Sequence, residues 1–197
     1  MKKKFSPIMI VHLVLLILMI LFNAFTAIMI LSGSGVESPS SAELLSIYLY
    51  GIISILNIIA FVCGVFYLLR RYSKQAAGLY KAFMLLFFII QLLYIWLNIH
   101  SNSYAQFSNF VPSVILASLR AIFFLIFGFW KDLGKRNTWI IFGVYFAMNI
   151  ITMFLFSDVS YVTLFIVISK LSGLLKDGTI ALAIRGKYAD KDARGTK

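Results

Sequence analysis

Charged residues are scarce in this chain, and acidic residues are the scarcest of them. Charged residues make up 13% of the sequence, about half the share found in soluble proteins. Only 7 Asp and Glu occur among 197 residues, whereas hydrophobic residues make up 61%. A water-soluble fold of this length could not cover so much apolar surface, but lipid can solvate it. The composition therefore predicts an integral membrane protein without a sizeable soluble domain.

Residues that carry most enzyme chemistry are also rare. The single cysteine, Cys63, lies inside an apolar run and allows neither an internal disulfide nor a cysteine-based zinc site. The two histidines, His12 and His100, are expected on opposite sides of the membrane. The zinc-protease, nucleophile-elbow and Walker motifs are absent from the sequence. We therefore expect no enzyme activity, no metal site and no cofactor.

Six long apolar runs are present, and each is long enough to form a membrane-spanning helix. They cover residues 8–31, 44–69, 82–99, 111–130 and 139–156, and a last run from 159 to either 175 or 184. The first run is longer than the apolar part of a secretory signal peptide, so we expect it to be retained. The connections are short, so consecutive spans should be antiparallel neighbours. The sequence thus predicts an all-α bundle of six transmembrane helices in one membrane domain, 1–186, followed by a flexible tail, 187–197.

Basic residues alternate from one connection to the next. All of the 18 Lys and Arg except Arg120 and Lys170 precede the first run, occupy the second and fourth connections, or lie at or beyond the inner end of the last run. Because short cytoplasmic loops are enriched in Lys and Arg, this pattern predicts a cell-membrane protein with both termini in the cytoplasm. The net charge of +11 is then a topology signal. It can attract anionic lipid headgroups, and we expect no nucleic-acid partner.

Strongly polar residues fall near the middle of several apolar runs. Arg120 is central in the fourth run and Lys170 lies within the sixth, while the second, third and fifth runs carry Asn57, Gln91 and Asn149. A charge at this depth costs at least about 2.5 kcal/mol on insertion scales and is a functional-site hypothesis by default. We expect no acidic residue at the same depth. These residues therefore predict a cationic site that an anionic small molecule, or the carboxylate of a partner membrane subunit, would complete.

A structural role for the same residues is the alternative. The amides would then form hydrogen bonds between helices, and Lys170 would extend toward the cytoplasmic surface. Arg120 would bond to backbone carbonyls and amide side chains. Small residues that include Ala117 and Ala121 lie near Arg120 on one helical face, and such residues let helices approach closely. This pattern places Arg120 beside a helix contact under either interpretation.

The segment from Asp177 to Ala181 resembles the opening of the motif of membrane CDP-alcohol phosphotransferases. Leu182 and Leu174 occupy the positions where that family has Arg and Asp, so the resemblance does not carry the activity over. The acidic residues are also too few and too peripheral for a site built on two carboxylates. A catalytic function is therefore not expected.

The size and the layout of six spans are similar to those of the substrate-binding subunits of energy-coupling-factor vitamin transporters. Those subunits use a small-residue pattern in the first span for docking, whereas Ala24 and Ala27 have a different spacing here. The resemblance implies a small transport or ligand-binding membrane component. The alternative is a non-catalytic accessory or assembly subunit that pairs with another membrane protein in the lipid bilayer.

Overall fold

The computed structural model describes residues 6–32, 41–70, 73–101, 107–130, 133–155 and 164–195. Within them it has six helices: α1 (Pro7–Leu31), α2 (Ser41–Leu69), α3 (Ala76–Ser101), α4 (Phe107–Phe129), α5 (Lys135–Leu155) and α6 (Leu164–Gly195). The prediction of an all-helical fold is confirmed for this part of the chain.

Four of these helices contain stretches that are long and apolar enough to cross a membrane. The stretches are Pro7–Ile30, Leu44–Leu69, Ala76–His100 and Pro112–Phe129. Along α1, large side chains such as Leu21, Phe25 and Ile28 point away from the protein and are exposed. A row of exposed apolar side chains suits contact with lipid, where a helix also satisfies its own backbone hydrogen bonds. These features suggest a membrane protein.

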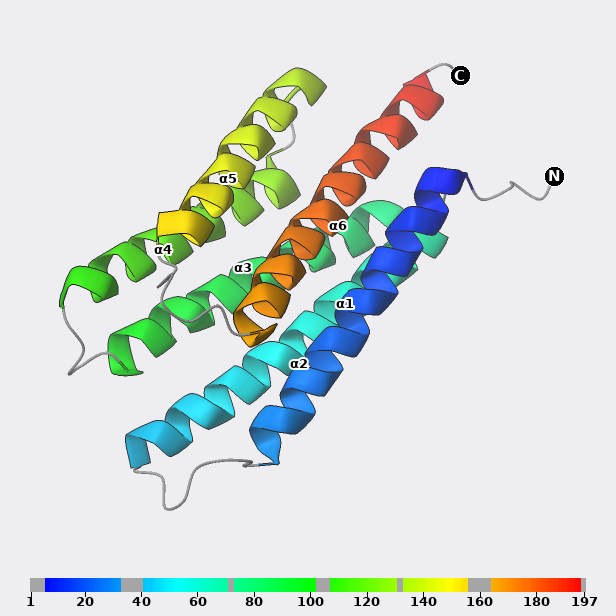
Figure 1. The fold of residues 1–197 in the computed structure, drawn as a ribbon. Helices are drawn as coiled ribbons and strands as arrows, with labels where there is room; N and C mark the ends of the chain where they lie inside the picture. The colour runs from blue at the N-terminus through cyan, green and yellow to red at the C-terminus, as the bar shows by residue number, and fades with distance from the viewer. Residues whose placement is uncertain are drawn as a thin grey trace.

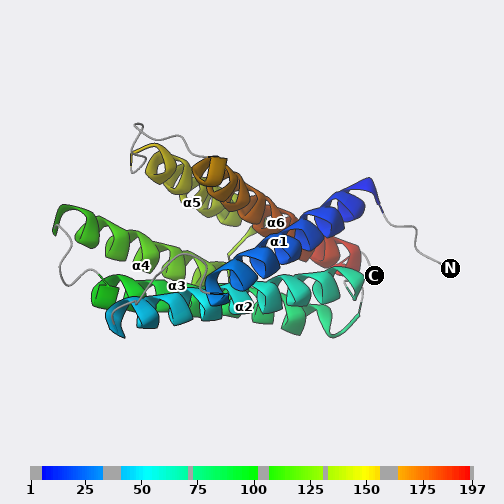
Figure 2. The same ribbon diagram turned by 60° about the horizontal axis from the view of Figure 1, so that its bottom comes forward.

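The helices form two uneven groups. Helices α1 to α4 pack as consecutive neighbours, with α2 between α1 and α3, and α3 between α2 and α4 (Figure 1). Helices α5 and α6 lie on one side of the row formed by α2, α3 and α4 (Figure 2). Helix α6 packs mainly along α1, while α5 contacts α4 and α6 only sparsely. The loose packing of α5 leaves space beside α3 and α4.

Close packing of the first three helices depends on Gly64. A Cβ atom at this position would lie 2.9 Å from Leu16 Cδ2 and 3.1 Å from the ring of Phe83. A larger residue would therefore require the side chain of Leu16 or Phe83 to move. The absence of a Cβ atom lets three apolar helices approach closely, as is common in membrane bundles.

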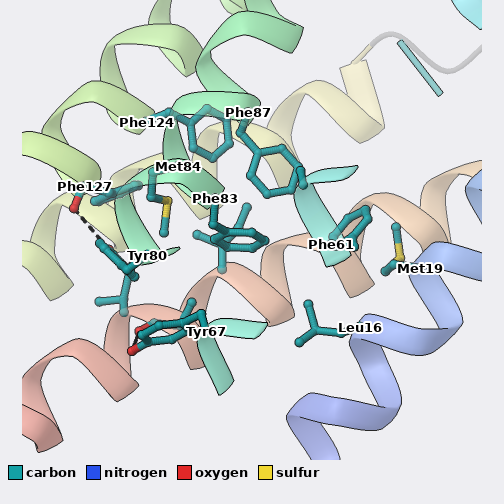
Figure 3. Close-up of a cluster of buried hydrophobic side chains, with 14 of the residues drawn as sticks. Leu16, Met19, Phe61, Tyr67, Tyr80, Phe83, Met84, Phe87, Phe124 and Phe127 are labelled. Carbon is teal, nitrogen blue, oxygen red and sulfur yellow. Dashed lines mark hydrogen bonds between the residues drawn. The ribbon is translucent and has the colours of Figure 1, made fainter. Parts of the chain in front are cut away.

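An aromatic cluster fills the space between α2, α3 and α4 (Figure 3). Phe61, Phe83, Phe87 and Phe124 are completely buried. The rings of Phe87 and Phe124 stack with their centroids 5.2 Å apart, and Phe83 meets Phe87 edge to face at 5.0 Å. This cluster makes one half of the bundle a tightly packed support for the more open half.

Helix α6 continues past both of the alternative inner ends that the sequence predicts for the last span. Neither residue 175 nor residue 184 ends the helix, which runs to Gly195 and includes most of the segment expected to form a tail. Side chains hold its second half in place: Tyr67 Oη donates to the carbonyl of Ala183 at 3.3 Å, and Tyr188 Oη donates to that of Leu133 at 2.7 Å. This anchoring explains why the helix continues into a charged sequence.

The end of α4 is joined to α3 and α6 through one carbonyl group. The backbone oxygen of Phe127 accepts hydrogen bonds from Tyr80 Oη at 3.1 Å and from Lys187 Nζ at 3.1 Å (Figure 3 shows the first). Carbonyls in the last turn of a helix lack partners within that helix. These two donors therefore complete the end of α4 and fix the second half of α6 against it.

Candidate functional site

A cavity of about 450 Å³ lies where α5 and α6 separate from α3 and α4. It is partly open, and all four helices contribute to its lining. Since successive helices alternate in direction, Arg120, Gln91 and Asp177 lie about halfway along their helices. Asn98 and Ser113 lie nearer the end of the bundle that carries the connection from α3 to α4.

Arg120 extends from α4 into this cavity and binds two oxygen atoms of α5. Its Nε donates to Asn149 Oδ1 at 2.8 Å, and its Nη2 donates to Thr152 Oγ1 at 3.3 Å. Thr152 is itself fixed, because its hydroxyl donates to the backbone oxygen of Asn149 at 2.9 Å. Arg120 therefore has the kind of oxygen partners that a cation among apolar helices requires.

Asp177 supplies a carboxylate to the same cavity and is only 2% exposed. Its Oδ1 accepts a hydrogen bond from Tyr145 Oη at 2.8 Å, and its Oδ2 accepts one from Asn149 Nδ2 at 3.0 Å. Asn149 thus directs its amide oxygen toward the cation of Arg120 and its amide nitrogen toward the carboxylate. Charges on both sides fix the orientation of this amide.

The expectation that no acidic residue lies at this depth was wrong. Asp177 follows residue 175, the shorter of the two predicted ends of the last span, and so it was assigned to the periphery. It is buried because α6 continues past that point and packs on α1, where Leu15 Cδ1 would lie 3.9 Å from a Cβ atom on Gly178. The longer predicted end, residue 184, would have placed Asp177 inside the span.

Three of the five predicted site residues meet in the cavity: Gln91, Arg120 and Asn149 line it. Asn57 is not among the lining residues, and its Nδ2 donates to the carbonyl of Ile53 in its own helix at 3.0 Å. Lys170 belongs to α6, but its side chain lies outside the part of the structure that is described. A ligand-binding role for these residues stays a prediction.

Lys176, Tyr94 and Thr152 also line the cavity and are not among the residues predicted from the sequence. Lys176 was counted among the basic residues at the inner end of the last span. It is close enough to interact electrostatically with both Asp177 and Arg120. The same uncertainty about the end of the last span hid both Lys176 and Asp177.

Several polar groups in the cavity have no hydrogen-bonding partner among the described residues. Lys176 forms neither a hydrogen bond nor an ion pair with them, and the same holds for the amide of Gln91, although that residue is only 2% exposed. Nη1 of Arg120 also lacks an acceptor within the described chain. None of these unbonded atoms is fully enclosed by the described residues, so each is accessible from the cavity. The cavity therefore presents donors that an external acceptor could satisfy.

The charges and side-chain types limit what the cavity can hold. Arg120 and Lys176 carry two positive charges and Asp177 one negative charge, so the net charge of the three is positive. Among the described residues, no group of three or more His, Cys, Asp or Glu could hold a metal ion. Comparisons with models of protein families, with curated proteins and with solved structures found no match to this chain. Neither resemblance drawn from the sequence gains support, and the chemistry of the cavity is the basis for a functional proposal.

Proposed function

We propose that this chain is a small membrane component that binds a small ligand in the cavity between α3, α4, α5 and α6 and takes part in its transport. One observation carries the proposal: cationic and amide groups line the cavity without partners among the described residues. In membrane proteins, ionisable groups among apolar helices are costly, and they mark ligand and ion pathways. A ligand with acceptor atoms would offset that cost.

We further propose that all six helices cross the cell membrane and that both termini are cytoplasmic. The alternation of basic connections supports this orientation. Lys74, Lys81, Lys135 and Arg136 are exposed at the end of the bundle opposite to Asn98 and Ser113. In this orientation Asn98 and Ser113 lie on the outer side of Arg120, and we propose that the cavity opens there.

Aromatic side chains pack between Arg120 and the proposed cytoplasmic end of the bundle, which supports a cavity that is accessible from the other side alone. The ring of Tyr145 lies 5.7 Å from that of Phe124 and 6.0 Å from that of Phe127. On the same side, Tyr188 and Lys187 of α6 bind the carbonyls that border the connection between α4 and α5. A ligand site open on one side and closed on the other is what alternating access requires of each state.

Native mass spectrometry of the purified full chain tests the proposal. We expect a bound small molecule in the wild type, because the unpartnered donors favour an occupied cavity. Arg120→Leu should abolish this adduct, and Arg136→Leu, which removes an exposed arginine at the start of α5, should keep it. Uptake of the identified molecule into proteoliposomes then separates transport from binding alone.

The same experiment separates the proposal from its alternative. A second protein chain that co-purifies with the wild type and is lost in Arg120→Leu would indicate an accessory subunit whose partner fills the cavity. An adduct of equal abundance in Arg120→Leu would contradict the assignment of the ligand site to this cavity.

A further inference from the structure

Resting on the proposed ligand cavity, we propose that its ligand is an organic monocarboxylate, whose carboxylate binds between Arg120, Lys176 and Gln91. The geometry of the guanidinium group, the unpartnered donors, the net charge and the size of the cavity each restrict the ligand. Together they select this chemical class.

The guanidinium of Arg120 has one edge occupied and one edge free. Nε and one N–H of Nη2 form its side edge, and the oxygens of Asn149 and Thr152 accept from them. The end edge consists of Nη1 and the second N–H of Nη2, and no described residue accepts from it. Two parallel N–H groups match the two oxygens of a planar carboxylate. Helix α5 thus orients Arg120 so that a bidentate position remains for a ligand.

Lys176 and Gln91 add donors from two other helices. Lys176 lies on α6 and Gln91 on α3, and both line the cavity without a hydrogen bond to the described residues. The amide atoms of Gln91 form no hydrogen bond with the described residues, yet they are not fully enclosed by protein. The amide therefore faces the cavity. An ammonium and an amide N–H are suitable donors to a carboxylate. Three helices therefore contribute donors to one small volume.

The charge balance favours a singly charged anion. With Arg120, Lys176 and Asp177 ionised, a carboxylate brings the net charge of the site to zero. A phosphate monoester carries about −1.5 to −2 charges near neutral pH, so it would leave excess negative charge beside the buried Asp177. Tyr145 and Asn149 already donate hydrogen bonds to Asp177. On the side of α1, the neighbouring Gly178 faces the apolar side chain of Leu15. Asp177 therefore acts against anions of higher charge.

The size of the cavity and its apolar wall require an organic body on the ligand. Cavities that hold small organic ligands measure about 300–1,000 Å³, and this one measures about 450 Å³. Leu116, Ala117 and Leu174 also line the cavity; the first two precede Arg120, and the third precedes Asp177, by about one helical turn. A bare inorganic anion would leave this apolar part empty. A carboxylate attached to a small apolar group would fill both parts.

Binding to the full chain in lipid nanodiscs tests the ligand class, with equilibrium dialysis as the measurement. Benzoate and hexanoate probe soluble carboxylates, and oleate probes a membrane-derived one. Benzamide and hexanamide are matched neutral compounds, and phenyl phosphate is a matched dianion. We expect benzoate or hexanoate, or oleate if the source is the membrane, to bind at least about tenfold more tightly than the neutral or dianionic compounds, because hydrogen bonds to a charged acceptor are stronger.

Variants connect this binding to the proposed residues. Arg120→Lys keeps the charge but removes the planar fork, and should weaken carboxylate binding about tenfold. Lys176→Met removes a half-buried cation that forms no hydrogen bond with the described residues, so this variant should fold, and it should also weaken binding about tenfold. Arg70→Lys and Lys81→Met make the same changes at exposed positions and should leave binding unchanged.

The outcomes distinguish this inference from the proposed function on which it rests. If the amides or phenyl phosphate bind as tightly as benzoate, and Lys176→Met still weakens them, the monocarboxylate class is wrong but the ligand cavity stands. If carboxylates bind equally to the wild type and to both cavity variants, the assigned position is wrong. If no carboxylate binds, the inference fails, and the adduct seen by native mass spectrometry decides the proposed function separately.

Discussion

Arg120 and Asp177 share one amide and do not form a direct ion pair. Asn149 accepts from Arg120 Nε at 2.8 Å and donates to Asp177 Oδ2 at 3.0 Å, so the two charges are held on opposite sides of its side chain. This relationship links α4, α5 and α6 at the base of the cavity. It also leaves the end edge of the Arg120 guanidinium available, which a direct bidentate pair with Asp177 would have occupied.

The first prediction compares two asparagines that differ in their partners. Asn57→Leu removes a bond to the backbone of its own helix and should cost no more than about 0.6 kcal/mol, the average measured for hydrogen bonds between membrane helices. Asn149→Leu removes bonds to two charged side chains and should cost about 2 kcal/mol or more. Thermal melting of both variants in the same detergent measures the difference. Equal loss of stability would contradict the bridging role of Asn149.

The second prediction concerns the carboxylate of Asp177. Asp177→Asn preserves the shape of the side chain but removes its negative charge, which repels an anionic ligand. Carboxylate binding should therefore tighten about tenfold, as expected for removing one charge several ångströms away in a partly buried site. Phenyl phosphate should gain more than benzoate, because it carries more negative charge. Competition dialysis with both compounds gives this ratio, and a loss of phenyl phosphate relative to benzoate would be the opposite result.

The third prediction addresses the close packing at Gly64. Gly64→Val would press against Leu16 and Phe83 and should destabilise the fold by about 1–3 kcal/mol. Gly143→Val is the matched control, since a Cβ atom at Gly143 would meet nothing within 4 Å. Both variants are compared by the temperature at which the purified protein loses its monodisperse peak in size-exclusion chromatography. Similar temperatures for the two would show that α2 does not depend on this contact.

The fourth prediction concerns the orientation of the chain in the membrane. In a Cys63→Ala background, a cysteine introduced at Ser34 or Ser103 should react with an impermeant maleimide added outside intact cells. A cysteine at Ser73 or Lys135 should react only after the membrane is made permeable. The reason is the enrichment of Lys and Arg in cytoplasmic loops. Outside labelling at Ser73 would reverse the proposed topology.

The all-helical fold followed from the sequence because the apolar runs dominate it. A chain in lipid must satisfy its backbone hydrogen bonds within each segment, so long apolar runs have few alternatives to helices. The inner end of the last span was harder to predict. Asp177 and Lys176 are polar residues placed between apolar stretches. The burial of Asp177 depends on the packing of α6 against α1 and on the hydrogen bonds that Tyr145 and Asn149 of α5 donate to it. A pattern within one segment does not contain that tertiary information.

The candidate site was also predictable only in part: the sequence identified Arg120 but did not distinguish the roles of the two asparagines. The central position of Arg120 in an apolar run was sufficient to mark it, whatever its neighbours. Asn57 and Asn149 look alike in sequence, yet one bonds within its own helix and the other connects two charged groups. The difference arises from which face of each helix meets a neighbour. Hydrophobic periodicity is weak in helices that lipid surrounds, so the sequence did not separate the two.

The central claim is that the cavity holds an organic anion against Arg120, and crystallography with 4-bromobenzoate tests it most directly. Anomalous scattering locates the bromine without reference to the protein coordinates. We expect one bromine peak inside the cavity beside Leu116 and Leu174, with the carboxylate of the ligand facing the Arg120 guanidinium. Bromine found only on the lipid-facing surface, with the cavity unoccupied at a saturating ligand concentration, would contradict it.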